Sequence, residues 1–123
     1  MNAVAQIAAI TMGLILVTVF VCESFLFRRR ELYPFFLIEP GEEAAVRLWT
    51  VNQGFYNLCF GIAALGGVAL VDLGYETVGQ TLVVFTAVSM IVLGVVLFFS
   101  ERRLWRSTIL CCLPPTVLLV ALA

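Results

Sequence analysis

The residues best suited to chemistry gather in two short segments of an otherwise apolar chain, Glu23 and residues 52–57. The second segment reads Asn-Gln-Gly-Phe-Tyr-Asn and places three amides and a phenol within two helical turns. Amides and carboxyls need partners in apolar surroundings, and an acid within a membrane segment is a functional hypothesis by default. A carboxyl at Glu23 could attract a cation or carry a proton, while the amides and the phenol orient a ligand.

The composition of the chain indicates whether these segments are surrounded by water or by lipid. The 123-residue chain is 63% hydrophobic and 12% charged, and its mean hydropathy is +1.10. A soluble domain of this size leaves too much surface exposed to hide so many apolar side chains. Composition therefore excludes a soluble globular domain, a disordered chain and a nucleic-acid-binding protein, and it favours a lipid bilayer as the main partner.

Four apolar stretches, at about residues 3–27, 48–71, 79–100 and 108–123, predict membrane spans. A spanning helix needs about 20 apolar residues. The fourth stretch is short and contains Pro114 and Pro115, so we expect a kink or an irregular turn there. The predicted fold class is an all-α polytopic membrane protein: one domain, residues 1–123, forming an antiparallel bundle of four transmembrane helices.

The arginines predict the orientation of this bundle. All seven basic residues are arginines, and they fall between the first and second spans or between the third and fourth: Arg28, Arg29, Arg30, Arg47, Arg102, Arg103 and Arg106. Cytoplasmic loops carry the basic residues. Both termini are therefore expected outside and the long first loop inside. The basic cluster follows the first apolar run, the reverse of a secretory signal, so we expect that run to be a retained helix.

The long first loop divides into an apolar and an acidic part. Residues 33–38 are apolar and aromatic, and we expect them at the membrane surface. The acidic part reads as a helix start, so the second helix is expected to begin near Gly41, outside the lipid. Glu43 and Arg47 lie four residues apart and can pair on that helix.

At 100° per residue, the second helix divides into one apolar stripe and two inner flanks. The stripe expected to face lipid consists of Val51, Phe55, Leu58, Ile62, Leu65 and Ala69. The flanks expected to touch neighbouring helices are Asn52, Tyr56, Cys59, Ala63, Gly66 and Gly67 on one side, and Gln53, Gly54, Asn57, Gly61 and Ala64 on the other. Small residues allow close helix approach and amides then bond across the contact. The second helix is therefore expected at the centre of the bundle.

Antiparallel spans bring Glu23 to the depth of the amides. Glu101 closes the third span at the same side. The predicted ligand-binding cluster is Glu23, Asn52, Gln53, Tyr56, Asn57 and Glu101. Two structural alternatives stay open: the amides could serve only to bond helices together, and Glu23 could pair with Arg28. Glu101, next to Arg102, is also explained as an acid at the membrane interface.

The remaining chemistry is sparse. The chain has no histidine, and its four cysteines, Cys22, Cys59, Cys111 and Cys112, form no C-x-x-C motif. We interpret them as small hydrophobic residues. There is no nucleophile–base pair, metal cluster or phosphate-binding loop, so we expect no catalytic residue, no metal site and no cofactor. A membrane enzyme stays open as a third function, in which Glu23 and Tyr56 would do acid–base work on a lipid.

Glu23 with the following Ser-Phe-Leu-Phe, and the Asn52–Asn57 motif, resemble the domain-of-unknown-function 1304 family of small bacterial membrane proteins. That family carries approximately Glu-Met-Phe-Leu-Trp, a loop, and then Ala-Asn-Gln-Gly-Leu-Tyr-Asn. The resemblance implies a four-span inner-membrane protein and singles out Glu23, Asn52, Gln53, Gly54, Tyr56 and Asn57. Members often have a histidine in the first span, near Leu16 here, and Gln-Gly where this chain has Cys111-Cys112.

Two functions follow as expectations. The first is an integral bacterial inner-membrane protein that binds or transports a small molecule or a lipid in a polar pocket of the inner leaflet. Four helices enclose little volume, so transport would need a homodimer. The second is a structural or accessory protein for another membrane protein, whose polar residues only join helices, with the arginines free to bind anionic lipids.

Overall fold

The computed structural model describes all residues, 1–123, and contains helices and no strands. Four long helices are α1 (Ala3–Ser24), α3 (Glu43–Asp72), α4 (Glu76–Ser100) and α5 (Trp105–Leu122). Short helices lie between them: η1 (Arg30–Leu32), α2 (Tyr33–Phe36) and η2 (Arg102–Leu104). The 4 long helical segments are each long and apolar enough to cross a membrane, which confirms the all-α class and the number of candidate spans.

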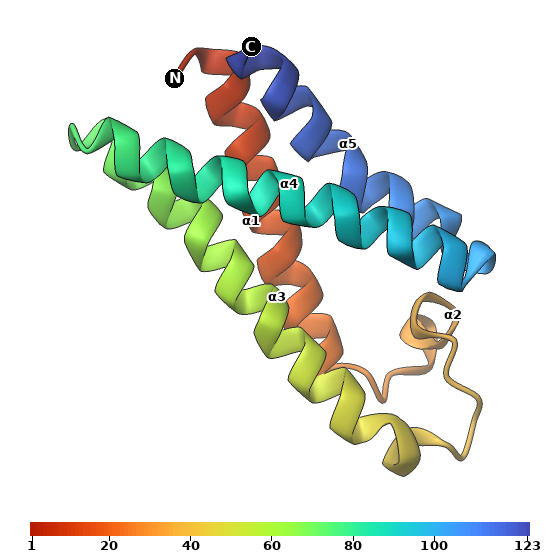
Figure 1. The fold of residues 1–123 in the computed structure, drawn as a ribbon. Helices are drawn as coiled ribbons and strands as arrows, with labels where there is room; N and C mark the ends of the chain where they lie inside the picture. Colours follow the sequence, from red (N-terminus) through yellow and green to blue (C-terminus); the bar gives the residue numbers. More distant parts are fainter.

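Consecutive long helices run in roughly opposite directions, and α4 crosses α1 at a steep angle in the view of Figure 1. Helix α1 packs on α3, α3 on α4, α4 on α5, and α5 returns to α1, whereas α1 and α4 barely touch across the diagonal. The two chain termini lie side by side. The main core lies between the four long helices and contains many small side chains, among them Ala5, Ala8, Ala9, Ala64 and Ala87.

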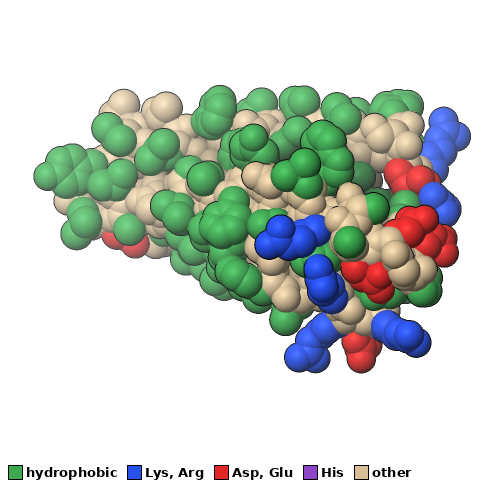
Figure 2. Space-filling model, turned by 90° about the horizontal axis from the view of Figure 1, so that it is seen from below, with side chains coloured by type: hydrophobic (Ala, Val, Ile, Leu, Met, Phe, Trp, Pro, Cys, Tyr) green, Lys and Arg blue, Asp and Glu red, His purple; other side chains and the backbone are tan.

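The two ends of the bundle differ in charge. All seven arginines lie where α1 and α4 end and α3 and α5 begin, a region that we call the arginine end. Figure 2 shows these blue side chains, with most of the visible acids, gathered at one end of an otherwise largely apolar face. At the opposite end, Gln6 Nε2 donates to both carboxylate oxygens of Asp72, at 3.1 and 2.8 Å. The terminal amino group lies 3.8 Å from Glu76. The acids of the α3–α4 turn therefore hold the start of α1.

Helices α3 and α4 touch most closely near their connecting turn. A Cβ atom placed on Gly79 would lie only 2.4 Å from the carbonyl oxygen of Gly67 and 2.8 Å from the backbone nitrogen of Val71. Only glycines allow this approach of two backbones. From there the two helices diverge toward the arginine end (Figure 1).

The helix bounds depart from the sequence prediction at one edge of the first loop and agree with it at the other. Helix α1 ends at Ser24 rather than at residue 27, whereas α3 begins at Glu43, close to the expected start near Gly41. Pro114 and Pro115 lie inside α5, which stays helical throughout. Of the two expected alternatives, a kink or an irregular turn, the structure shows the first, because the axis of the continuous helix α5 bends midway along its length (Figure 1).

The first loop folds into a small second core rather than lying flat. Phe27, Tyr33 and Ile38 are buried together, and Val46 and Val51 of α3 pack against them. The Tyr33 hydroxyl donates a hydrogen bond to Glu43, which raises the pKa of the phenol above its usual value. The pairing of Glu43 with Arg47 expected from their spacing is wrong, because Glu43 accepts from the loop instead.

The outward faces of α3 also differ from the prediction. The flank with Gly54, Gly61 and Ala64 is buried, as expected. On the other predicted flank only Gly67 meets a helix of this chain, whereas Asn52, Tyr56 and Cys59 are exposed. The sequence predicted that both flanks pack against other helices. In the structure the flank with Gly54 is buried against α1, whereas the other flank meets a helix only near Gly67, in the last turns of α3.

Candidate functional site

A buried carboxyl–amide pair joins α1 to α3. Glu23 lies in the last turn of α1 and is 8% exposed. Asn57 lies in the first half of α3 and its Nδ2 atom donates to Glu23 Oε1 over 2.6 Å. The two residues meet because α1 and α3 are antiparallel and in contact along their length. The structure thus brings together the acid and one amide of the predicted cluster.

The contact around this pair is unusually close. Ser24 Oγ donates to the carbonyl oxygen of Val51 over 3.0 Å. A Cβ atom on Gly54 would lie 2.0 Å from Ser24 Oγ and 3.1 Å from the carbonyl oxygen of Phe20. Gly54 is therefore the residue that allows the acid and the amide to meet. Ser24 was not among the predicted site residues, although its place next to Glu23 could have drawn attention to it.

The second oxygen of Glu23 has no partner in the protein. Oε2 accepts no hydrogen bond. Every fully buried side-chain nitrogen or oxygen atom of the chain has a hydrogen-bond partner, so Oε2 is partly exposed at the surface. The ion pairs of the chain join Met1 to Glu76 and Glu101 to Arg103, and Arg28 is in neither of them. The suggested pairing of Glu23 with Arg28 is therefore wrong. An acid with one amide partner and no cation can take a proton or a single positive charge.

Asn52 and Tyr56 lie on a different side of α3 from Asn57, whereas Gln53 is only about 40° from Asn57 around the helix but is exposed. Asn52, Gln53 and Tyr56 are exposed and, with Leu48 and Trp49, line a shallow groove of about 350 Å³. Asn52 Nδ2 donates to the carbonyl oxygen of Leu48 in its own helix, over 2.7 Å. At 100° per residue, Asn52 and Tyr56 point about 140° and 100° away from Asn57. The prediction of one cluster containing all these residues is wrong for this reason.

Glu101 also lies apart from Glu23. It follows α4 at the arginine end and binds Arg103 through both oxygens, each over 2.8 Å. The hydrogen bonds from Arg103 lower the pKa of the Glu101 carboxyl to about 2. Its place outside the spans matches the alternative interpretation, an acid at the interface.

The Glu101–Arg103 pair gives a pH prediction. A carboxyl with a lowered pKa adds stability above its usual pKa of 4.5, and that stability is lost as the pH falls through the folded value of about 2. We expect the side-chain carbon of Glu101 to titrate near pH 2 by NMR. The Arg103→Gln variant should move the midpoint toward the usual value. Equal midpoints in both proteins would contradict the pairing.

The four cysteines differ in exposure: Cys59 is exposed, and the other three are half-buried. All four thiols are free, and Cys112 lies against Gly94 of α4, where its Sγ atom is 3.8 Å from the carbonyl oxygen of Ile91. No three histidine, cysteine or acidic side chains lie close enough together to hold a metal ion. Glu23 is thus not one member of a larger group of ligating side chains.

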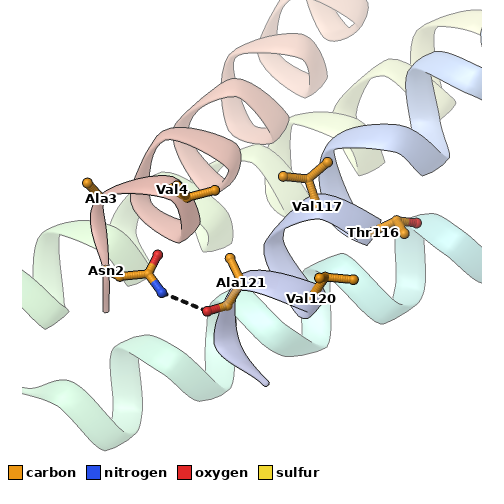
Figure 3. Close-up of a pocket in the computed structure, with 7 residues that line it drawn as sticks. All are labelled: Asn2, Ala3, Val4, Thr116, Val117, Val120 and Ala121. Atoms are coloured by element: carbon orange, nitrogen blue, oxygen red, sulfur yellow. Dashed lines mark hydrogen bonds between the residues drawn. The ribbon is translucent and has the colours of Figure 1, made fainter.

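A second hollow lies between the beginning of α1 and the end of α5 (Figure 3). Its lining consists of Asn2, Ala3, Val4, Thr116, Val117, Val120 and Ala121. The amide of Asn2 is bonded at both polar atoms: Nδ2 donates to the carbonyl oxygen of Ala121 over 2.7 Å, and Oδ1 accepts from the Ala5 backbone over 2.8 Å. The walls that remain are mostly apolar, so this groove suits a hydrocarbon chain rather than a charged ligand.

Comparison with known proteins places the chain in a family without assigning an activity. The family model described as protein of unknown function DUF1304 matches residues 10–123. This match includes Glu23, Gly54 and Asn57. Neither a curated protein nor a solved structure matches the chain. Because the family model matches almost the whole length, residues 10–123, the chain belongs to the DUF1304 family.

Proposed function

We propose that this chain is an integral protein of the bacterial inner membrane that binds a small molecule or a lipid carrying one positive charge, with Glu23 as the anionic group. The observation that carries the proposal is the geometry of Glu23: a buried carboxyl held at Oε1 by Asn57, with Oε2 accessible and unbonded. A buried acid without a cation from its own protein is an unusual feature that favours a ligand.

The position of Glu23 along the bundle supports an inner-leaflet site. Arginine-rich loops favour the cytoplasm, so the arginine end is assigned to that side. Asp72 lies at the other end of α3. Asn57 is 15 residues from Asp72, which corresponds to about 22 Å of helix, and the hydrocarbon core is about 30 Å thick. The Glu23–Asn57 pair therefore lies within the cytoplasmic half of the hydrocarbon region.

The charge of the site limits the ligand class. One carboxylate is neutralised by one positive charge, such as an ammonium group or a proton. The Asn57 amide holds the carboxyl in place, and the apolar surroundings strengthen its attraction for a cation. A lipophilic monocation is therefore a better fit than a divalent metal ion, because Glu23 belongs to no group of three or more side chains that could hold a metal ion.

Binding is the step that this site supports. Transport would in addition require Glu23 to be reached from both sides of the membrane in turn, which calls for a second arrangement of the helices.

The experiment uses tetraphenylphosphonium, a lipophilic monocation, titrated into the protein in lipid nanodiscs with empty nanodiscs as the blank. We expect saturable binding to the wild type. The Glu23→Gln variant should bind about tenfold more weakly or not at all, because a charge-assisted contact becomes a neutral one. Glu101→Gln is the matched control, an acid at the same end of the bundle, and should bind as the wild type does. Equal affinities for all three proteins would refute the proposal.

A second function is favoured by the tight contact around Gly54, in which Ser24 and Asn57 join α1 to α3. In that case the polar residues only hold the bundle together, and the protein acts as a structural or accessory partner in the membrane. The same Glu23→Gln variant separates the two functions. A ligand site predicts lost binding with unchanged stability, whereas a purely structural contact predicts unchanged binding.

A further inference from the structure

One surface of α3 has the residues of a helix–helix contact but no helix of this chain against it. It consists of Trp49, Asn52, Tyr56, Cys59, Ala63, Gly66 and Leu70, which we call the α3 seam. These positions alternate in steps of three and four, the spacing by which two helices stay in contact along a left-handed pair. Trp49 is 73% and Tyr56 69% exposed, and a Cβ atom on Gly66 would meet nothing within 4 Å.

The seam differs from the other outward faces of the bundle. Helix α4 exposes large apolar side chains such as Phe85, Val92 and Phe99, and α1 exposes Ile7 and Leu14. These faces suit hydrocarbon. The seam instead exposes an amide, a phenol and a thiol. A mid-helix glycine costs about 1 kcal/mol relative to alanine, and Gly66 gains no contact within the chain in return. Its surface suits another helix better than it suits lipid.

We propose that the α3 seam is the interface of a parallel homodimer. Two copies insert in the membrane in the same direction, so a two-fold axis normal to the bilayer brings each seam residue to its counterpart. The side chains of the α3 seam must therefore pack and hydrogen-bond against the same side chains of a second copy. Asn52 meets this demand because an amide both donates and accepts, and only one of its hydrogens is used, toward Leu48.

Charge also favours a second copy. Arg47 is the one charged residue between Ala45 and Leu70, and its position on the helix points away from the α3 seam. The seam therefore contains no charged side chain. Like charges therefore do not meet at the axis. The groove formed by Leu48, Trp49, Asn52, Gln53 and Tyr56 is open in one chain, and the second copy supplies its missing wall. This inference does not depend on a ligand at Glu23.

The test uses Cys59, a natural thiol on the seam. In a variant whose other cysteines are replaced by serine or alanine, oxidation by copper phenanthroline in native membranes should join two chains through a Cys59 disulfide, with oxygen accepting the electrons. The control moves the single thiol to the lipid-facing position Ile62→Cys, which is 59% exposed and about 60° around the helix from Cys59 at similar depth. We expect strong dimer formation for Cys59 and little for the control.

A second variant tests the packing itself. Gly66→Leu should fold normally, because nothing lies near its Cβ position, but it should reduce the Cys59 dimer about tenfold by holding the two helices apart. Circular dichroism checks the fold. Equal cross-linking at Cys59 and at Ile62→Cys, or cross-linking of Cys59 only to proteins of other sequence, would overturn the homodimer.

Discussion

The Gly79→Leu variant is expected to lose about 3 kcal/mol of folding free energy, the upper part of the range for an overpacked contact. Its Cβ atom would meet the carbonyl oxygen of Gly67 at 2.4 Å and the backbone nitrogen of Val71 at 2.8 Å. Both are backbone atoms that no side-chain rotation can move. The helices α3 and α4 would have to separate where their backbones come closest.

Unfolding in mixed micelles of dodecyl maltoside and SDS, followed by far-ultraviolet circular dichroism, measures this loss. Gly66→Ala is the control, because it adds a methyl group to α3 at a position where no other atom of the chain lies within 4 Å. Leucine and alanine both favour a helix over glycine by up to about 1 kcal/mol. Propensity alone would therefore stabilise both variants. If Gly79→Leu unfolds at the same or a higher SDS fraction than wild type, the α3–α4 crossing is wrong.

Asn57→Leu is expected to destabilise the protein by about 1–3 kcal/mol, the cost of leaving a buried polar group without its partner. The variant removes the 2.6 Å hydrogen bond to Glu23 and leaves both carboxyl oxygens unbonded. The same unfolding assay measures the change, and Thr18→Leu is the control because the exposed Thr18 hydroxyl bonds only to the carbonyl oxygen of Leu14 in its own helix.

The double variant Glu23→Leu with Asn57→Leu makes this prediction sharper. When both partners become apolar, no buried polar group is left unpaired, and most of the lost stability should return. If the double variant is as unstable as the sum of the two single variants, the pair does not interact in the way described.

Much of the fold follows from hydropathy because a bilayer imposes one simple rule. Each crossing requires about 20 apolar residues with their backbone groups bonded internally, so the four stretches had to become helices. The start of α3 at Glu43 was also predictable, from the proline, glycine and acids before it. The fold of the first loop was not, because the burial of Tyr33 and Ile38 against Val46 depends on contacts between segments.

The candidate site was predictable in part for the same reason. Periodicity identifies which residues of α3 share a face, and it correctly placed Gly54 and Asn57 together on a packed side. It does not reveal which face receives a neighbour. A bundle of four helices gives α3 close contact with α1 on one side and with α4 only near Gly67, so Asn52 and Tyr56 stay outside.

Glu101 shows a further limit of reasoning from depth alone. Its place at the end of the third span put it at the level of Glu23, but depth does not say how far apart two residues lie across a bundle. Helices α1 and α4 lie on a diagonal and barely touch. Arg103, two residues along the chain, is the partner that Glu101 reaches.

The measurement that tests the central claim most directly is native mass spectrometry of the protein released from native nanodiscs, for the wild type, Glu23→Gln and Glu101→Gln. We expect a bound small molecule or lipid on the wild type and on Glu101→Gln, with a mass that identifies its class, and its absence from Glu23→Gln. An adduct that persists on Glu23→Gln, or no adduct on any of the three proteins, would contradict the assignment of Glu23 as a ligand-binding acid.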